Sequence, residues 1–247
     1  MKFAIIAAGE GSRLSREGAG IPKPLVRING EHMIDRLIRI FNENGAEEIV
    51  VIVNCLTDSV RNHIIAHYNT ITTGIEGEKT TVLPAKPLVR LVCKTTPSSM
   101  HSFFELSSYI SDGKFCLTTV DTIFNEQEFG KYIKEFECSD ADGLMAVTDY
   151  VDDEKPLYVG TDSGLNITGF HDKNEGDTYI SGGIYCLVPE TLQTLHKCME
   201  QGQSRMRNFQ RQLVADGHKL KAYPFKKIVD VDHVDDIVKA EQFLAQK

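Results

Sequence analysis

The sequence KFAIIAAGEGSRLSREGAGIPKPL occupies residues 2–25 and combines an apolar run with a glycine turn that is followed by Arg13 and Lys23. The apolar run, residues 3–8, is typical of a buried parallel strand. The glycines at positions 9 and 11 let a ligand approach the backbone N–H groups of the turn closely. Arg13 and Lys23 bring positive charge to this turn, and a proline on each side of Lys23 stiffens the backbone there. The combination predicts a site for an anion, such as the phosphates of a nucleotide.

The rest of the chain predicts an α/β fold. Strand-like runs alternate with helical patterns in the first half, which favours βαβ units and a mostly parallel sheet. The strand-like runs are 2–8, 48–53, 88–93 and 114–120, and the helical patterns lie near 31–44, 57–67 and 100–110. After residue 140 short β-like runs are separated by turn-rich segments, which is typical of mixed or antiparallel sheet. These runs are 143–149, 156–160, 165–170 and 178–187; helical patterns follow at 189–199 and 204–215, then a strand near 219–230 and a last helix at about 233–245.

We therefore expect one domain, residues 1–247, with a Rossmann-like three-layer α/β/α sandwich around a mostly parallel mixed sheet. No Pro/Gly/Ser-rich linker or charge block marks a boundary near residue 140. Residues 69–87 are polar, contain threonine, glycine and two prolines, and are predicted to be an insertion or surface excursion.

Net charge, cysteine spacing and the length of apolar segments indicate which partners and which compartment to expect. The formal net charge of −8 argues against a nucleic-acid-coating role and against binding to anionic membranes. Six cysteines lie far apart without a C-x-x-C pair, several in apolar runs, so we expect buried reduced thiols and a cytoplasmic protein. The apolar stretch at the N-terminus is too short for a signal sequence, and no segment has transmembrane length.

The pattern A-A-G-x-G-S-R-L followed by P-K-P-L resembles the signature of the nucleotidyltransferases that make nucleotide-sugars, the sugar-phosphate pyrophosphorylases. The resemblance covers nearly the whole chain and implies the nucleotide-diphospho-sugar transferase type of fold. It implies that the glycine loop wraps an NTP, that an arginine contacts its phosphates and that a lysine supports the departing pyrophosphate. The nucleotide-binding residues implied are Ala7, Ala8, Gly9, Gly11, Ser12, Arg13 and Lys23, of which Arg13 and Lys23 are also catalytic. The family's usual Pro-x-Thr after the arginine is replaced here by residues 15–18.

A magnesium site follows from the same resemblance. The strand-like run 115–120 ends at Asp121, as does the family strand that delivers a catalytic, metal-binding aspartate, although this residue also suits the start of a helix near Asn125. The segment from Val229 resembles the family's carboxylate motif before the last helix. Asp230 and Asp232 point to the same face of an extended strand, so both can reach a metal, and Asp230 is narrowly favoured. Mg²⁺ prefers oxygen ligands and usually takes one or two protein carboxylates.

Three further segments resemble the parts of the family that bind base and acceptor. Lys173 occupies the place of a lysine that grips the acceptor phosphate. Gly182 and Gly183 lie where a glycine strand approaches the sugar, although a β-bulge would explain them equally well. Ser98 and Ser99 take the place of the segment that reads the base, although helix capping would explain them too.

The expected function is Mg²⁺-dependent coupling of an NTP to a phosphorylated small molecule, a sugar 1-phosphate in the first instance, with release of pyrophosphate. A homo-oligomer is compatible with the sequence. Four alternatives stay open: a cytidylyltransferase for a non-sugar phosphate such as phosphocholine, a non-catalytic nucleotide-sugar-binding subunit, a sugar transferase and a dehydrogenase. The last is disfavoured because the third glycine of a dinucleotide fingerprint would fall at Leu14.

Overall fold

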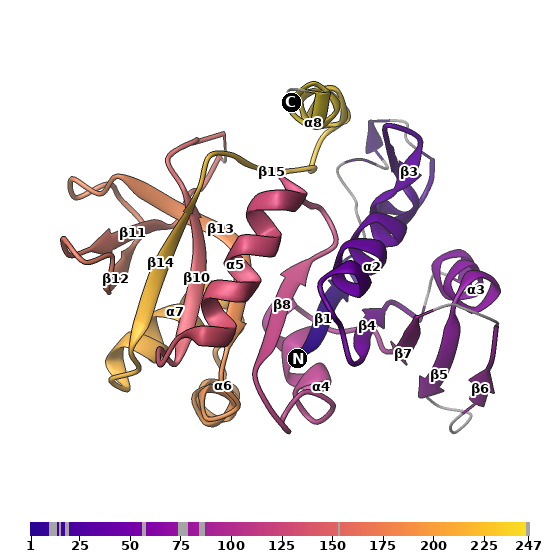
Figure 1. Ribbon diagram of the computed structural model, residues 1–247, viewed down its shortest axis with the longest axis horizontal. Coiled ribbons are helices and arrows are strands. Elements are labelled where there is room, and N and C mark those ends of the chain that lie inside the picture. Colours follow the sequence, from indigo (N-terminus) through magenta and orange to yellow (C-terminus); the bar gives the residue numbers. More distant parts are fainter. Residues whose placement is uncertain are drawn as a thin grey trace.

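The computed structural model describes residues 1–9, 14, 16–17, 20–55, 58–73, 79–83, 87–152 and 154–245. Within these residues a central sheet of eleven strands runs through the whole molecule (Figure 1). Its strands are β1 (Lys2–Ala7), β4 (Ile49–Val53), β5 (Asn69–Thr73), β6 (Lys79–Thr81), β7 (Leu88–Cys93), β8 (Phe115–Thr119), β10 (Gly143–Thr148), β11 (Tyr158–Thr161), β12 (Ile167–His171), β13 (Tyr179–Leu187) and β14 (Leu220–Phe225).

The order of the strands places five parallel strands, β8, β1, β4, β7 and β5, side by side. The main path is β12-β11-β13-β8-β1-β4-β7-β5-β6, and β10 lies between β13 and β14. β1 pairs in parallel with β4 and β8, and β4 pairs in parallel with β7. Because parallel neighbours end at the same edge of a sheet, the residues that follow β1, β4 and β8 are brought together.

Helices cover both faces of the sheet because its central strands are apolar on both sides. In β1, Phe3 and Ile5 belong to one buried cluster, and Ala4 and Ile6 to the other. The first cluster packs against α2 (Met33–Glu43), α3 (Asp58–His67), α5 (Glu126–Cys138) and α8 (Val234–Ala245), and the second against α4 (Ser99–Ser107), α6 (Thr191–Glu200) and α7 (Met206–Ala215). The predicted three-layer α/β/α architecture with a mixed, mostly parallel sheet is confirmed (Figure 1).

A short hairpin, a separate antiparallel strand pair and a single helical turn complete the fold. They are β2 (Arg27–Ile28) with β3 (Glu31–His32), β9 (Thr122–Phe124) with β15 (Ile228–Asp230), and the 3₁₀ turn η1 (Lys23–Leu25). Two of these strands, β3 and β15, are labelled in the upper part of Figure 1. β9 follows β8 directly, so its pairing with β15 carries the chain before α8 to the end of β8.

Three sequence expectations need adjustment. The described parts of segment 69–87 are not a mere surface excursion, because β5 pairs with β7 and β6 with β5; the threonines of β5 are β-branched and suit a strand. The predicted strand 219–230 is two strands, since the chain leaves β10 after Phe225 and pairs with β9 instead. All six cysteines are free, but only Cys116, Cys186 and Cys198 are buried, whereas Cys55 and Cys138 are exposed.

None of the described helices combines the length and apolar character needed to cross a bilayer.

Candidate active site

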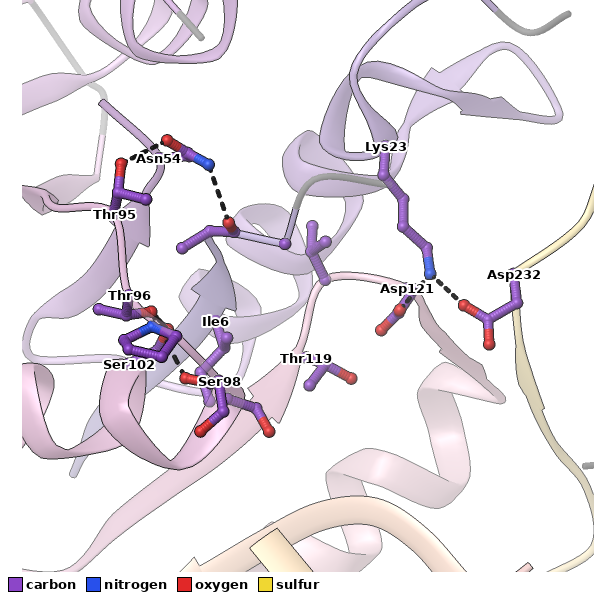
Figure 2. A pocket seen from close by; sticks show the side chains of 15 residues that line it. Ile6, Lys23, Asn54, Thr95, Thr96, Ser98, Ser102, Thr119, Asp121 and Asp232 are labelled. Atoms are coloured by element: carbon purple, nitrogen blue, oxygen red, sulfur yellow. Dashed lines mark hydrogen bonds and ion pairs between the residues drawn. The ribbon is translucent and has the colours of Figure 1, made fainter. Parts of the chain in front are cut away.

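A cavity of about 580 Å³ opens at the carboxyl ends of the central parallel strands (Figure 2). Ala8 and Gly9 follow β1, and Asn54 follows β4; Thr119 ends β8, and Asp121 lies two residues beyond it. We call it the strand-end cavity; its lining is Ile6, Ala8, Gly9, Lys23, Asn54, Thr95, Thr96, Pro97, Ser98, Ser99, Ser102, Thr119, Val120, Asp121 and Asp232. Open α/β sheets bind ligands at this edge, so the position itself is typical of a functional site.

One lysine is held between two carboxylates at the mouth of this cavity (Figure 2). Lys23 Nζ lies 2.5 Å from Asp121 Oδ2 and 2.6 Å from Asp232 Oδ1. The lysine opens η1, with Pro22 before it and Pro24 after it. Because proline fixes φ, the two rings leave the backbone around Lys23 few alternatives.

The charges of this group are partly removed from water. Only 9% of the Lys23 side chain is exposed. Burial opposes its charge, but the charges of Asp121 and Asp232 and the hydrogen bonds to them outweigh burial, so the pKa of Lys23 is raised. Asp121 Oδ1 is buried and has no hydrogen-bond partner among the described residues. A buried carboxylate oxygen without a donor, beside a second carboxylate, suits a hard divalent cation that takes oxygen ligands.

Backbone pairing positions Asp232 next to Asp121. In the antiparallel β9–β15 pair Asp230 lies opposite Thr122, and the Val231 N–H donates to the Asp121 carbonyl at 3.1 Å. Val231 is fully buried, so the residues on either side of it are turned away from the core. The pairing therefore fixes Asp232 on the same side as the end of β8.

The start of α8 stabilises this placement. The Asp236 carboxylate accepts hydrogen bonds from the backbone N–H groups of Asp232, at 3.1 Å, and His233, at 2.8 Å. His233 directly precedes α8, where a helix start leaves N–H groups unpaired, and a carboxylate in the first turn is favourable there. Asp236 thus supports the backbone that carries Asp232.

The turn after β1 is linked to the same helix start. Glu17 Oε1 lies 2.6 Å from His233 Nδ1, and its Oε2 accepts from the Val234 N–H at 2.9 Å. The hydrogen bond with His233 and then that from Val234 lower the pKa of Glu17. Residues 15–18, which depart from the family pattern, therefore include a contact to the segment that holds Asp232.

Small polar side chains line the opposite wall of the strand-end cavity (Figure 2). Asn54 accepts from Thr95 Oγ1 at 2.7 Å and donates to the Ala8 carbonyl at 3.5 Å. Thr96 Oγ1 lies 2.6 Å from Ser102 Oγ. Ser98 is the N-cap of α4 and accepts from the His101 N–H, so its capping role and its position on the wall are both real.

A second cavity of about 280 Å³ adjoins the first, because Asp232 lines both. We call it the acidic cavity, since its described lining includes five carboxylates but one lysine. Lys239 contacts two of those carboxylates, Asp152 at 2.9 Å and Asp236 at 3.1 Å. The lining is Thr148, Tyr150, Asp152, Glu154, Ile180, Ser181, Gly182, Ile228, Val229, Asp230, Asp232, His233, Asp236 and Lys239.

Glycines at this cavity have packing reasons as well. A Cβ on Gly182 would lie 2.2 Å from Ile228 Cδ1 and 3.2 Å from the Ala146 carbonyl oxygen. Gly183 has a φ of +73°, which favours glycine, and the β10–β13 register shifts beside it between Met145 and Val147. The bulge expected as an alternative is therefore present, and Gly182 also lines the acidic cavity.

A third, open cavity of about 810 Å³ shares Glu154 with the acidic cavity. Lys155, Lys173, Arg205, Arg207 and Arg211 bring five cations to its described lining. Two of these arginines already pair with Asp172: Arg207 at 2.5 Å and Arg211 at 2.8 Å. Lys173 thus lies in a cationic neighbourhood, separated from Lys23 by the acidic cavity.

The sequence profile described as "Nucleotidyl transferase" matches residues 2–247. The chain belongs to this family. The "Probable glucose-1-phosphate cytidylyltransferase" of Bacillus subtilis (strain 168) is 24% identical over 203 residues, 80% of this chain and 78% of the relative. The UTP–glucose-1-phosphate uridylyltransferase AglF of Haloferax volcanii is 26% identical over 205 residues, 79% of this chain and 75% of the relative.

A solved structure agrees on the fold of this nucleotidyltransferase. The inositol-1-phosphate CTP transferase from T. maritima superposes with a TM-score of 0.77 at 16% identity, covering 99% of this chain and 96% of that one. The resemblance inferred from the glycine turn and P-K-P-L is confirmed, and transferase activity follows from membership of the family.

The structure of this nucleotidyltransferase brings most predicted residues to one edge. Ala8, Gly9, Lys23, Ser98, Ser99, Asp121 and Asp232 line the strand-end cavity, and Ala7 ends β1 beside it. Asp230 and Gly182 line the acidic cavity, and Lys173 the cationic one. Gly11, Ser12 and Arg13 lie outside the described residues, so their roles stay predictions.

Sequence reasoning missed Asn54 and Thr119. It placed the segment 95–102 at the base-reading position but singled out only Ser98 and Ser99, and not Thr95, Thr96 or Ser102. For Asn54 a signal was available: it is a buried polar residue directly after the apolar strand 49–53, the same rule that pointed to Asp121. The threonines and Ser102 carry no comparable signal, because hydroxyl residues at helix starts and strand ends are common.

Proposed function

We propose that this nucleotidyltransferase transfers a nucleotidyl group from an NTP to a sugar 1-phosphate, with Mg²⁺, and releases pyrophosphate. The observation that carries the proposal is the Lys23–Asp121–Asp232 group at the mouth of the strand-end cavity. It combines a fixed cation with two carboxylates where a parallel sheet binds ligands, in a chain of the nucleotidyl transferase family.

The strand-end cavity suits the NTP. Backbone at Ala8 and Gly9 permits close approach of a polyanion, and a Cβ on Gly9 would meet nothing within 4 Å. Lys23 supplies positive charge, and Arg13 is proposed to add more. The hydroxyl and amide wall from Asn54 to Ser102 offers donors and acceptors for ribose and base.

The carboxylates suit magnesium. Asp121 and Asp232 both face Lys23 Nζ, and Asp121 Oδ1 lacks a partner among the described residues. We therefore propose Asp121 and Asp232 as the protein ligands of Mg²⁺. Asp230, two residues before Asp232, is the further candidate ligand. When bound, Mg²⁺ neutralises phosphate oxygens and orients them.

The acidic cavity suits the body of the acceptor. Carboxylates and Ser181 accept or donate hydrogen bonds to hydroxyl groups, and Gly182 leaves the backbone accessible there. Two relatives that align with about four fifths of this chain are named for glucose 1-phosphate. Lys173 and the arginines near it line the next cavity, beyond the acidic one. The predicted grip of Lys173 on the acceptor phosphate is therefore not part of this proposal, because that phosphate has to reach the α-phosphorus beside Asp232.

The chemistry needs little covalent help from the protein. An oxygen of the acceptor phosphate attacks the α-phosphorus, a new P–O bond forms, the bond to the β-phosphate oxygen breaks, and its electron pair leaves with pyrophosphate. The attacking oxygen is already ionised at neutral pH, so no general base is required. Lys23 then stabilises the negative charge that grows on the leaving pyrophosphate.

A second candidate acceptor is phosphocholine, because the acidic cavity favours a cationic group over a neutral one. Its described lining holds five carboxylates against Lys239 and His233. A quaternary ammonium group there would gain from those charges.

The test is pyrophosphate release with Mg²⁺, each NTP in turn, and glucose 1-phosphate, other sugar 1-phosphates or phosphocholine as acceptor. We expect release with a sugar 1-phosphate and one preferred NTP. Release with phosphocholine alone would select the second candidate. No release with any pair would overturn both, provided that thermal melts show folded protein.

A further inference from the structure

Two histidines and an aspartate converge on one point outside the strand-end cavity. His32 Nδ1 lies 2.9 Å from Asp35 Oδ2, and His63 Nε2 lies 2.8 Å from Asp35 Oδ1 and 2.9 Å from Oδ2. One ligand atom from each of these residues lies within 4.8 Å of the other two. The rings of His32 and His63 meet edge to face, with centroids 4.7 Å apart.

Two separate elements hold these side chains. His32 is the N-cap of α2, and Asp35 follows in the first turn of that helix. His63 projects from α3, about thirty residues later in the chain. The convergence therefore depends on the packing of two helices, and it is preorganised by the fold rather than by one flexible loop.

The cluster is protected but reachable. The exposed fractions of the His32, Asp35 and His63 side chains are 17%, 22% and 14%. This burial removes most competing water, while the remaining exposure leaves a path for a small ion. Tyr68 donates a hydrogen bond to Asp35 Oδ1 at 2.8 Å and so fixes the carboxylate from behind.

We propose that His32, Asp35 and His63 form a zinc site that joins the start of α2 to α3. Two imidazole nitrogens with one carboxylate oxygen are a typical donor set for Zn²⁺, with a fourth position for water. The same set binds Mg²⁺ poorly, because Mg²⁺ prefers oxygen ligands. The hydrogen bond from Tyr68 is of the kind that orients a ligating carboxylate.

This site is chemically separate from the proposed magnesium site. Asp121 and Asp232 offer oxygen alone, and they face a lysine. The nitrogen-containing cluster therefore selects a different metal, and its occupancy is expected to change stability more than catalysis. Bound zinc would fix the start of α2, which carries His32 and Asp35, against α3.

The experiment uses full-length protein stripped of metal with a chelator. Zn²⁺ is titrated against a chromogenic competitor, and Co²⁺ is added separately to record its visible spectrum. We expect one tight Zn²⁺ per chain and a rise in Tm of about 5–10 °C at a Zn²⁺ concentration near 100 times Kd. His63→Ala and Asp35→Asn should each weaken this binding by at least about 100-fold, and Tyr68→Phe by about 10-fold.

His67→Ala is the matched control. His67 stacks on His63, with ring centroids 4.3 Å apart, but it is not one of the three converging ligands. It should keep the tight Zn²⁺ site, and so should Asp121→Asn. The proposal is overturned if wild type binds no more Zn²⁺ than His63→Ala, or if His67→Ala removes the same site. Asp35→Asn, which preserves side-chain shape, decides the matter should His63→Ala fail to fold.

Discussion

The strand-end cavity and the acidic cavity share Asp232 but differ in charge and in how they are built. The first is formed by residues that follow parallel strands, and its one described lysine lies between two carboxylates. The second is formed around β15 and the start of α8, with carboxylates in excess. Neighbouring cavities of one enzyme thus present different chemistry to a ligand.

The difference suits a reaction between two unlike partners. A triphosphate requires cations and a metal, whereas the hydroxyl-bearing or cationic body of an acceptor favours hydrogen-bond acceptors. Asp232 stands at the boundary, where the α-phosphorus and the acceptor phosphate would have to meet. Variants at Lys23, Asp121, Asp230 and Asp232 test whether this boundary divides the two roles, and variants at Asp236 and Glu17 test contacts that hold its backbone.

The largest effect is expected at Lys23 and Asp121. Lys23→Ala and Asp121→Asn should each lower kcat by about 10²-fold or more, because each removes one preorganised charge from the triphosphate end. Steady-state pyrophosphate release measures this, with Lys131→Ala on the exposed side of α5 as the control. Near-normal turnover in both variants would contradict the proposal that the strand-end cavity binds the reacting NTP.

The second prediction separates the two carboxylates of the 230–232 segment. Asp232→Asn should lower kcat by about 10²-fold and raise the Mg²⁺ concentration for half-maximal rate, since Asp232 faces Lys23 beside Asp121. Asp230→Asn should mainly raise the acceptor KM, by about 10-fold, because Asp230 lines the acidic cavity. Magnesium titrations of both variants at saturating NTP give the comparison. An equal rise in the Mg²⁺ requirement of both variants would make both residues metal ligands and would contradict this division of roles.

The parallel half of the fold was predictable because its signals are local. Runs such as 49–53 are apolar throughout, and a strand buried on both faces needs that composition. The same logic located Asp121, because a carboxylate after a buried strand falls at the edge where ligands bind. Strand β5 was missed because its pattern N-T-I-T-T is polar, although its pairing with β7 places it in the sheet.

The choice between Asp230 and Asp232 was not predictable, because it depends on pairing over a long sequence distance. Alternation along a strand puts both aspartates on one face. Only the hydrogen bond from the Val231 N–H to the Asp121 carbonyl fixes which of them lies beside Asp121. With that pairing, β15 ends at Asp230, and Asp232 is the residue that reaches Lys23. No local sequence pattern predicts this pairing between segments about a hundred residues apart.

The third prediction concerns Asp236, which supports the boundary without touching the proposed substrates' phosphates. Asp236→Asn should lower kcat by about 10-fold and destabilise the fold by about 1 kcal/mol, because two backbone N–H groups at the start of α8 lose a charged acceptor. A raised Mg²⁺ requirement would identify the effect as displacement of Asp232, since a purely structural loss would leave it unchanged. Asp235→Asn makes the same charge change on the exposed side of that turn and should leave kcat and the Mg²⁺ requirement near wild type.

The smallest effect is expected at Glu17, which ties the turn after β1 to the start of α8. Hydrogen bonds with His233 and Val234 lower the pKa of Glu17, so the ionised form is favoured in the folded chain. Its contribution is therefore complete above the ordinary glutamate pKa of about 4.3 and is lost as pH falls through the lower folded-state value. Glu17→Gln should lower Tm by no more than about 2 °C at pH 6, because the carboxylate is exposed. Thermal melts from pH 6 to pH 3.5 should show the gap between wild type and variant closing on acidification, while Glu137→Gln on α5 shows no such gap. A gap that widens as pH falls would contradict the sign of this linkage and, with it, the role of Glu17 in holding the boundary.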